Sequence, residues 1–130
     1  MLRSRSMMLV SFDIDGTLET GDPPGPVTLD VVTEAKRRGY VVGSASDRTL
    51  AEQRRMWSGA GIDVDFVGHK HHLTELTSPF GCTRLVHIGD TAVDQHYAQL
   101  AGFEFWHVDQ LPEPMTPEWL DVLVDPRPQG

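Results

Sequence analysis

The sequence lacks several features that would mark a secreted or membrane protein. It holds one cysteine, Cys82, so no disulfide can form within the chain, and this suits a reducing compartment. No apolar run approaches the roughly 20 residues that a membrane-spanning helix requires. The short apolar stretch after Arg3 and Arg5 runs straight into Asp13, which is untypical of a signal peptide. We therefore expect a cytoplasmic protein with no membrane partner.

Positive charge is also scarce. The chain has 11 Lys and Arg residues against 19 Asp and Glu residues, and its formal net charge is −8. This balance argues against a broad surface for nucleic acid or for an anionic membrane, although it leaves room for a small basic pocket. The 130 residues suffice for one domain with a core, and 39% hydrophobic and 23% charged residues indicate a folded chain.

Short apolar strands alternate with amphipathic helices along the chain. We predict strands over residues 8–13, 40–45, 64–67, 85–88 and 103–108, and helices over residues 28–38, 50–60, 73–77, 92–101 and 118–124. This alternation favours a single α/β domain with a doubly wound, mainly parallel, five-stranded Rossmann-like sheet. The domain should span residues 8–124, with tails over 1–7 and 125–130 and a small Gly- and Pro-rich flap over 18–27.

Two acids, Asp13 and Asp15, lie at the carboxyl end of the first predicted strand. Open α/β sheets place their ligand sites at such strand ends. Side chains at positions i and i+2 point to the same side of an extended chain, and Gly16 then permits a sharp turn. The pair suits metal binding, covalent attack or acid–base catalysis, and a solvated strand end is the simpler alternative.

A second apolar strand, over residues 85–88, also runs into a glycine and acids. Asp90 falls at the strand end, and Asp94 lies in the first turn of the next predicted helix; either alone could be a helix-end acid. Because the ends of parallel strands share one edge of a sheet, these acids should converge with the first pair. Converging carboxylates repel one another unless a cation neutralises them, and all-oxygen ligation favours Mg²⁺ over Zn²⁺.

With these two motifs the chain resembles the haloacid dehalogenase (HAD) superfamily of phosphohydrolases. Residues 13–18 are similar to the first motif of that family and residues 89–94 to the fourth, in the family's order. The resemblance extends from about Leu9 to about Val108. It implies a HAD-like phosphatase that cleaves phosphate monoesters.

The resemblance also implies roles for the four acids. Asp13 would attack phosphorus and form an aspartyl-phosphate, and Asp15 would protonate the leaving alcohol and then activate water. Mg²⁺ would be held by Asp13, the backbone carbonyl of Asp15 and Asp90, with Asp94 bound directly or through water.

The second motif of the family is a hydroxyl at the end of the second strand. Ser46-Asp47-Arg48 resembles the Ser-Gly-Arg of many members, but Asp47 departs from that pattern, so the choice between Ser44 and Ser46 stays open. We favour Ser46. The phosphate contacts that the resemblance implies come from Gly16, Thr17, Ser46, Arg48 and Lys70.

Lys70 is the natural match for the third motif, a cation that neutralises phosphate, and an ordinary surface lysine is its alternative. Three histidines flank it, His69, His71 and His72, but neither a cysteine nor a paired-histidine spacing supports a zinc site there. His87 inside a strand is interpreted as structural.

The large cap domains of the family have no room in this chain, because only residues 18–27 and part of 71–84 are available for them. A capless member suits a phosphorylated small molecule or the exposed phosphate end of a larger substrate. Apolar surface around Trp106 or Trp119 would support a homodimer, whereas burial in the core is the alternative.

Three other classes share part of the pattern. The phosphatase domain of phage-type polynucleotide kinase is also capless, and its last strand resembles residues 102–108, so a nucleotide or polynucleotide 3′-phosphate is an alternative substrate. The negative net charge and the absence of a kinase-type Gly-rich phosphate loop do not favour nucleic acid. A response-regulator receiver also uses acidic strand ends and Mg²⁺, but its phosphoacceptor lies on a middle strand. A non-catalytic scaffold is the last alternative.

Overall fold

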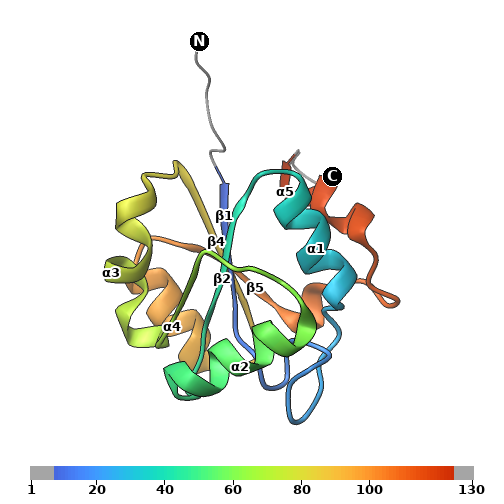
Figure 1. Ribbon diagram of the computed structural model, residues 1–130. Coiled ribbons are helices and arrows are strands. Elements are labelled where there is room, and N and C mark those ends of the chain that lie inside the picture. The colour runs from blue at the N-terminus through green and yellow to red at the C-terminus, as the bar shows by residue number, and fades with distance from the viewer. Residues whose placement is uncertain (1–7, 125–130) are drawn as a thin grey trace.

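A parallel sheet forms the centre of the molecule. The computed structural model describes residues 8–124, so the tails expected over 1–7 and 125–130 lie outside the described residues. The five strands follow the order β3-β2-β1-β4-β5, and every neighbouring pair is parallel (Figure 1). This confirms the predicted α/β class with a Rossmann-like sheet. The strands are β1 (Met8–Phe12), β2 (Val41–Ala45), β3 (Phe66–Gly68), β4 (Arg84–Gly89) and β5 (Glu104–His107).

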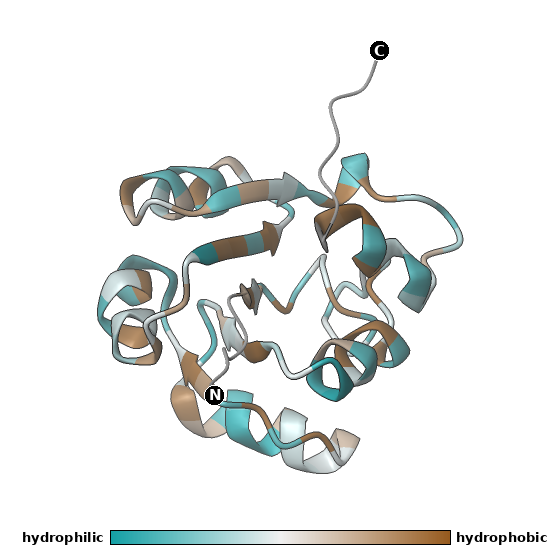
Figure 2. Ribbon diagram, turned by 90° about the horizontal axis from the view of Figure 1, so that it is seen from above, coloured by the Kyte–Doolittle hydropathy of each residue, from teal (hydrophilic) through white to brown (hydrophobic). Residues whose placement is uncertain are grey.

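Helices pack on both faces of the sheet. α1 (Leu29–Arg37), α2 (Leu50–Ala60) and α5 (Leu120–Val124) contribute to the core on one face, and α3 (Leu73–Thr77) and α4 (Ala92–Leu100) to the core on the other. Figure 2 shows the largely hydrophobic strands between the two helix layers. Within residues 8–124, no helix combines the length and the hydropathy that crossing a lipid bilayer requires. Short 3₁₀ turns cover Lys70–His72, Ser78–Phe80, Val108–Gln110 and Pro117–Trp119.

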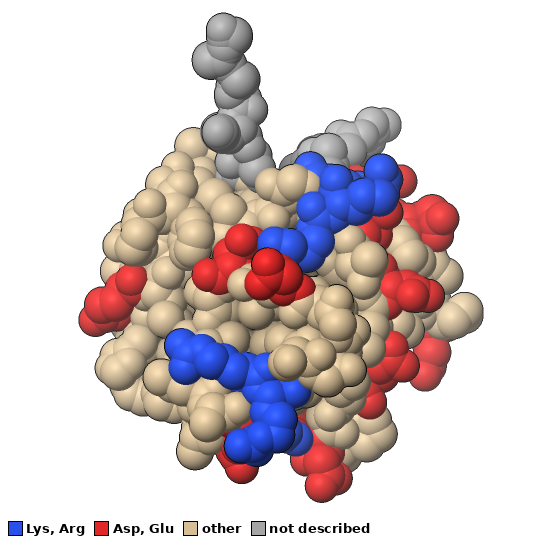
Figure 3. Space-filling model, in the orientation of Figure 1, with Lys and Arg blue, Asp and Glu red and all other residues tan. Residues whose placement is uncertain are grey.

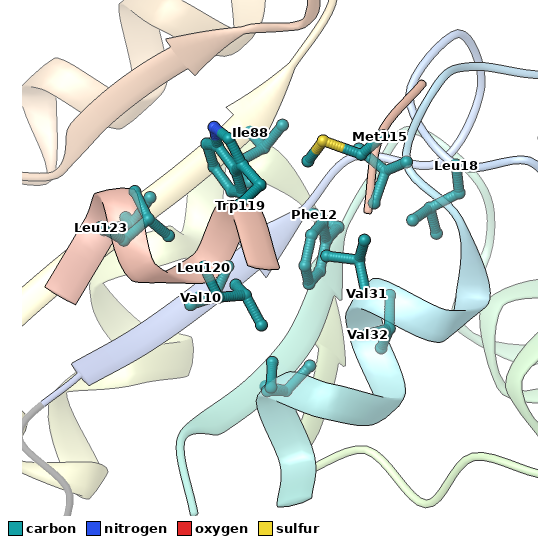
Figure 4. Close-up of a cluster of buried hydrophobic side chains, with 14 of the residues drawn as sticks. Val10, Phe12, Leu18, Val31, Val32, Ile88, Met115, Trp119, Leu120 and Leu123 are labelled. Carbon is teal, nitrogen blue, oxygen red and sulfur yellow. The ribbon is translucent and has the colours of Figure 1, made fainter. Parts of the chain in front are cut away.

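The central strand β1 is buried along its whole length. Val10 and Phe12 belong to the larger core, with Val31 and Leu120 (Figure 4). Leu9 belongs to the core on the opposite face. Burial on both faces explains why the strand is a continuous apolar run in the sequence. Each fully buried side chain of this size contributes about 1.5–3 kcal/mol, and together they hold the end of β1 in place.

Threonines fix the starts of the helices just beyond the strand ends. Thr28 caps α1 through its side chain. Thr49 and Thr91 close capping boxes at the starts of α2 and α4. A cap of this kind contributes about 0.5–2 kcal/mol. α2 and α4 therefore begin at the edge of the sheet where β2 and β4 end.

Residues 18–27, predicted as a small flap, form a loop that is fixed at its base. Leu18 and Val27 pair in an isolated bridge, and both side chains are fully buried. The N–H of Gly25 donates to the carbonyl of Leu18 at 2.9 Å. Between β3 and β4 the chain forms only α3 and two 3₁₀ turns, so neither position holds a cap domain.

The two tryptophans considered for a dimer surface pack against each other. The rings of Trp106 and Trp119 are 5.4 Å apart and nearly perpendicular. Trp119 is buried, and Trp106 is half-buried against the larger core. The core alternative therefore accounts for Trp119, and a homodimer stays a prediction.

Candidate active site

The candidate site lies at the edge where the parallel strands end. Asp13 follows β1, Ser46 follows β2, Lys70 comes shortly after β3, and Asp90 follows β4. The ends of parallel strands meet at one edge, so these side chains are brought together although they are far apart in the sequence. They surround a cleft of about 160 Å³, whose lining also includes Asp15, Pro23, Asp47 and Thr91.

Lys70 is a buried cation in this cleft. Its Nζ lies 3.5 Å from Asp13 Oδ2, 3.3 Å from Asp94 Oδ2 and 3.6 Å from Asp47 Oδ2. Burial lowers the pKa of Lys70, but the three carboxylates outweigh burial and raise it above its ordinary value. Lys70 is therefore charged at neutral pH and links the end of β1 to the first turn of α4.

Asp13 is 4% exposed and stands beside that cation. Burial, together with the negative charge of Asp94, raises the pKa of Asp13 to about 8, although Lys70 acts in the opposite direction. One lysine is therefore not enough to keep this buried carboxyl fully ionised at neutral pH. A further cation beside Asp13 would lower that pKa and hold the carboxylate in its charged form.

Three of the acids come close enough together to hold a metal ion. Asp13, Asp90 and Asp94 each offer one oxygen, all within 4.8 Å of one another, and no other such group of His, Cys, Asp or Glu occurs in residues 8–124. Gly16 has a φ of 76°, and a Cβ there would overlap the carboxylate of Asp90. Only glycine lets that carboxylate approach the turn. Because every donor is an oxygen, the residues present fit the predicted Mg²⁺.

Asp94 is fully buried, and both its oxygens accept hydrogen bonds. Oδ1 lies 2.9 Å from Nε2 of His87, and Oδ2 lies 2.7 Å from the hydroxyl of Thr91 and 3.3 Å from Nζ of Lys70. Burial raises the pKa of Asp94, but its interactions with His87, Thr91 and Lys70 hold it at about 2. Asp94 is thus an ionised anchor for Lys70, and its contact with a metal, direct or through water, stays a prediction.

His87 belongs to this group, although the sequence did not assign it there. It is fully buried inside β4, and its Nδ1 lies 2.9 Å from Oγ of Ser11. Its partner Asp94 lies beyond the strand end, so the contact depends on how the chain turns into α4. The local signal was one polar residue within an apolar strand.

The two candidate serines have different surroundings. Ser44 is fully buried; its hydroxyl donates to Oε1 of Gln53 at 2.7 Å and accepts from Nε1 of Trp57 at 2.9 Å. Ser46 lines the cleft, and its Oγ accepts a hydrogen bond from the N–H of Arg48 at 3.0 Å. The Ser46 hydroxyl can therefore donate into the cleft, whereas that of Ser44 is committed to the core.

Arg48 contacts Asp15 directly. Its Nη2 lies 2.6 Å from Oδ1 and its Nε 3.2 Å from Oδ2 of that carboxylate. The hydrogen bonds from Arg48 lower the pKa of Asp15 despite partial burial, with help from the N–H of Asp22. The side chain of Asp15 is thus ionised and paired with Arg48, and it is not part of the group formed by Asp13, Asp90 and Asp94.

Gly16 and Thr17, both predicted to contact phosphate, do not line the cleft. Thr17 is fully buried, and its Oγ1 has no hydrogen-bond partner in residues 8–124. Gly16 borders a second cavity of about 530 Å³ between the flap and the segment after β5. The rest of that cavity is lined by Pro24, Gly25, Pro26, Val108, Asp109, Leu111 and Glu113.

The three histidines beside Lys70 contact one another. The rings of His69 and His71 are 5.7 Å apart, and those of His71 and His72 are 4.1 Å apart. His71 and His72 are exposed and His69 is half-buried, and none of the three lines the cleft. Comparisons of the chain with models of protein families, with curated proteins and with solved structures give no match, so the assignment of function depends on the geometry described above.

Proposed function

We propose that this protein is a Mg²⁺-dependent phosphohydrolase of the HAD type, which cleaves phosphate monoesters through an aspartyl-phosphate. The observation that carries the proposal is the buried carboxylate of Asp13, which lies 3.5 Å from Nζ of Lys70 and within 4.8 Å of an oxygen of Asp90. Phosphoryl transfer depends mainly on positioning and on neutralising charge. A nucleophile, a fixed cation and a cation-binding carboxylate at one sheet edge meet both needs.

Asp13 is the nucleophile in this mechanism. One of its oxygens attacks phosphorus, and the bond from phosphorus to the leaving oxygen breaks as the new bond forms. Lys70 favours the ionised form of Asp13 throughout, because it is buried beside that carboxylate. Asp13 and Asp90 would hold Mg²⁺, which supplies positive charge to the phosphoryl oxygens.

Asp15 is the acid and base, and Arg48 controls its availability. A phosphoryl group in the cleft offers Arg48 anionic oxygens that compete with the carboxylate of Asp15. Once released, Asp15 can carry a proton and give it to the leaving oxygen. It then takes a proton from the water that attacks phosphorus, while the bond from phosphorus to Asp13 breaks.

Ser46 and Lys70 would hold the phosphoryl group during transfer. The Ser46 hydroxyl can donate into the cleft from the end of β2, and Lys70 lines the same cleft from the turn after the neighbouring strand β3. A non-catalytic scaffold would need no such pair of donors, whereas a receiver would need donors of the same kind for its bound phosphoryl group. Turnover separates these classes, because a receiver keeps its phosphate and a scaffold takes none.

The test is Mg²⁺-dependent release of phosphate from p-nitrophenyl phosphate by the full chain. Asp13→Asn should lower kcat by at least about 10³-fold, because loss of a covalent nucleophile removes the main route. Asp63→Asn, which changes an exposed acid outside the cleft, is the matched control and should keep wild-type activity. Removal of Mg²⁺ with a chelator should abolish turnover.

A trapped intermediate provides the second half of the test. Acid quenching during turnover should yield a phosphorylated wild-type chain that hydroxylamine cleaves, as expected of an acyl phosphate, and Asp13→Asn should yield none. Wild-type turnover that survives Asp13→Asn or chelation would contradict the proposal.

A further inference from the structure

We propose that His87 is a positioning residue, which acts through Asp94 to fix Lys70 against Asp13. The kinetic part of this proposal rests on the proposed function, and a spectroscopic part is independent of it. The contacts run from β1 to β4, from β4 to the start of α4, and from there back to the end of β1.

The first contact joins the two central strands. Ser11 of β1 lies directly opposite His87 of β4, and both residues are fully buried. Oγ of Ser11 is 2.9 Å from Nδ1 of the ring. Because the carboxylate of Asp94 accepts from Nε2, Nδ1 of a neutral ring accepts from the Ser11 hydroxyl. Ser11 thereby fixes the orientation of the imidazole ring.

The second contact joins β4 to α4. Nε2 of His87 lies 2.9 Å from Oδ1 of Asp94. On the other side of the carboxylate, the hydroxyl of Thr91 donates to Oδ2 at 2.7 Å. A carboxylate that is held from both sides in a buried position has one orientation.

The third contact reaches the nucleophile. Oδ2 of Asp94 lies 3.3 Å from Nζ of Lys70, and the same Nζ lies 3.5 Å from Oδ2 of Asp13. Lys70 has a long and flexible side chain, so its position depends on the anions around it. If Asp94 turned, Nζ would follow it away from Asp13.

Burial of His87 is costly unless both ring nitrogens find partners. An apolar side chain would fill the same place in β4 without needing Ser11 or Asp94. The histidine instead provides the hydrogen bond to Oδ1 that Thr91 and Lys70, both on Oδ2, leave unfilled. Among the described residues, His87 alone holds one oxygen of the Asp94 carboxylate while Thr91 and Lys70 hold the other, and for this reason we assign His87 a role in the geometry of the cleft.

The spectroscopic test uses a property of the sequence: the chain has two lysines, Lys36 and Lys70. Labelling lysine side chains with ¹⁵N gives two Nζ signals, and Lys36→Arg assigns them. His87→Leu should shift the Lys70 signal and leave that of Lys36, which pairs with Asp65, unchanged. An unmoved Lys70 signal in folded His87→Leu would overturn the proposal, whatever the protein catalyses.

The matched control is Val86→Ala. Val86 is the buried neighbour of His87 in β4 and faces the other core, so its truncation destabilises the strand without touching Asp94. It should leave the Lys70 signal in place. A shift of equal size in Val86→Ala would make the effect one of general packing and would overturn the proposal.

The kinetic test separates kcat from KM. His87→Leu should lower kcat about 10- to 100-fold, with little change in KM. This is the usual effect of removing the hydrogen-bond partner that orients a functional side chain, which here is Asp94. His87→Gln, whose amide N–H can donate to Asp94, should recover part of that loss, and Val86→Ala should keep kcat. Wild-type kcat in His87→Leu would overturn the proposal.

Failure of the proposed function and failure of the role of His87 give different results. If the wild-type chain has no turnover on any phosphate monoester, the proposed function fails, and the Lys70 signal still decides the role of His87. If His87→Leu does not fold, His87→Gln and Ser11→Ala provide the same two measurements, with shifts in the same direction but smaller.

Discussion

Ser44 and Ser46 lie on either side of the end of β2 and have different surroundings. Ser44 joins Gln53 and Trp57 in the core, so its hydroxyl stabilises the packing of α2 on the sheet. Ser46 faces the cleft. Two residues with the same chemistry, two positions apart, can therefore be told apart by whether a substitution affects folding or catalysis.

We expect Ser44→Ala to lower the free energy of unfolding by about 1–3 kcal/mol, because it leaves buried polar atoms of Gln53 and Trp57 without a partner. Ser46→Ala loses one partly buried hydrogen bond from the N–H of Arg48, so it should lower that free energy by less, and it should lower kcat/KM by about 10²-fold, as for the loss of one preorganised donor. Urea denaturation and steady-state kinetics on both variants provide the measurement. The reverse pattern would assign the phosphate contact to Ser44.

Most of the candidate site could be predicted at this scale, because Asp13, Asp90 and Lys70 lie at strand ends that a parallel sheet must bring together. What the sequence could not provide was the set of partners. Arg48 was predicted to contact phosphate, and the structure pairs it with Asp15, 33 positions away. The contact of His87 with Asp94 likewise depends on the path of the chain and not on a local pattern.

At the scale of the element, ion pairs stabilise the end of α1. Glu34 forms ion pairs with Arg37 at 2.6 Å and with Arg38 at 2.9 Å. Arg38 also reaches Asp121 of α5 at 2.9 Å, so the same group links two helices on one face of the sheet. Basic residues at the end of a helix also suit its negative pole.

This group gives stability a pH dependence. Hydrogen bonds from Arg37 and then Arg38 lower the pKa of Glu34 from 4.5 to about 2. A lowered pKa in the folded state means that the contribution is fully present above pH 4.5 and is lost as the pH falls towards 2. Glu34→Gln should therefore unfold at lower urea concentration than wild type at pH 7, with a gap that narrows below pH 4.5.

Denaturation midpoints at a series of pH values provide that measurement. Glu75→Gln, which changes an exposed glutamate on α3, is the control and should follow the wild type throughout. A gap between Glu34→Gln and wild type that stays constant down to pH 3 would contradict the ion-pair account, since it would not follow the lowered pKa.

The bounds of the elements were predictable because strands and helices here carry clear signals, such as apolar runs and the threonine caps. The strand expected over residues 64–67 instead begins at Phe66. The N–H of Val42 donates to the side-chain carboxylate of Asp65 at 2.9 Å instead of to a backbone carbonyl of β3. Regular pairing between β2 and β3 therefore starts at Phe66, opposite Gly43. A side chain that replaces a backbone acceptor leaves no trace in a hydrophobic pattern.

At the scale of the whole molecule, charge is unevenly distributed. Figure 3 shows basic side chains over α2 and at the end of α1, with acidic side chains between them. The cavity beside the cleft has Asp109 and Glu113 in its lining and no Lys or Arg among the described residues that form it. A polynucleotide would need cations along its backbone, so this cavity does not favour the 3′-phosphatase alternative.

We expect the cavity to select against leaving groups that carry a further negative charge. Glycerol 3-phosphate and 3-phosphoglycerate form a matched pair, because the first carries an alcohol at the carbon where the second carries a carboxylate. A like charge about 4 Å away costs about 1 kcal/mol in water, so kcat/KM should be roughly 5-fold lower for 3-phosphoglycerate. Asp109→Asn combined with Glu113→Gln should narrow that ratio, and Asp63→Asn should not. Equal kcat/KM for both substrates with the wild type would place the leaving group elsewhere.

The base of the flap has a consequence for the fate of the phosphoryl group. Backbone hydrogen bonds between Val27 and both Thr17 and Glu19, and from Gly16 to Pro23, fasten the loop on both sides. A loop fastened at its base is less free to move over the cleft than a loop without such bonds. An enzyme that passes a phosphoryl group to a second alcohol must shield its covalent intermediate from water while the acceptors exchange. In the phosphatase proposed above, a fastened loop gives little such shelter, so we expect phosphate to be released to water rather than passed to a second alcohol.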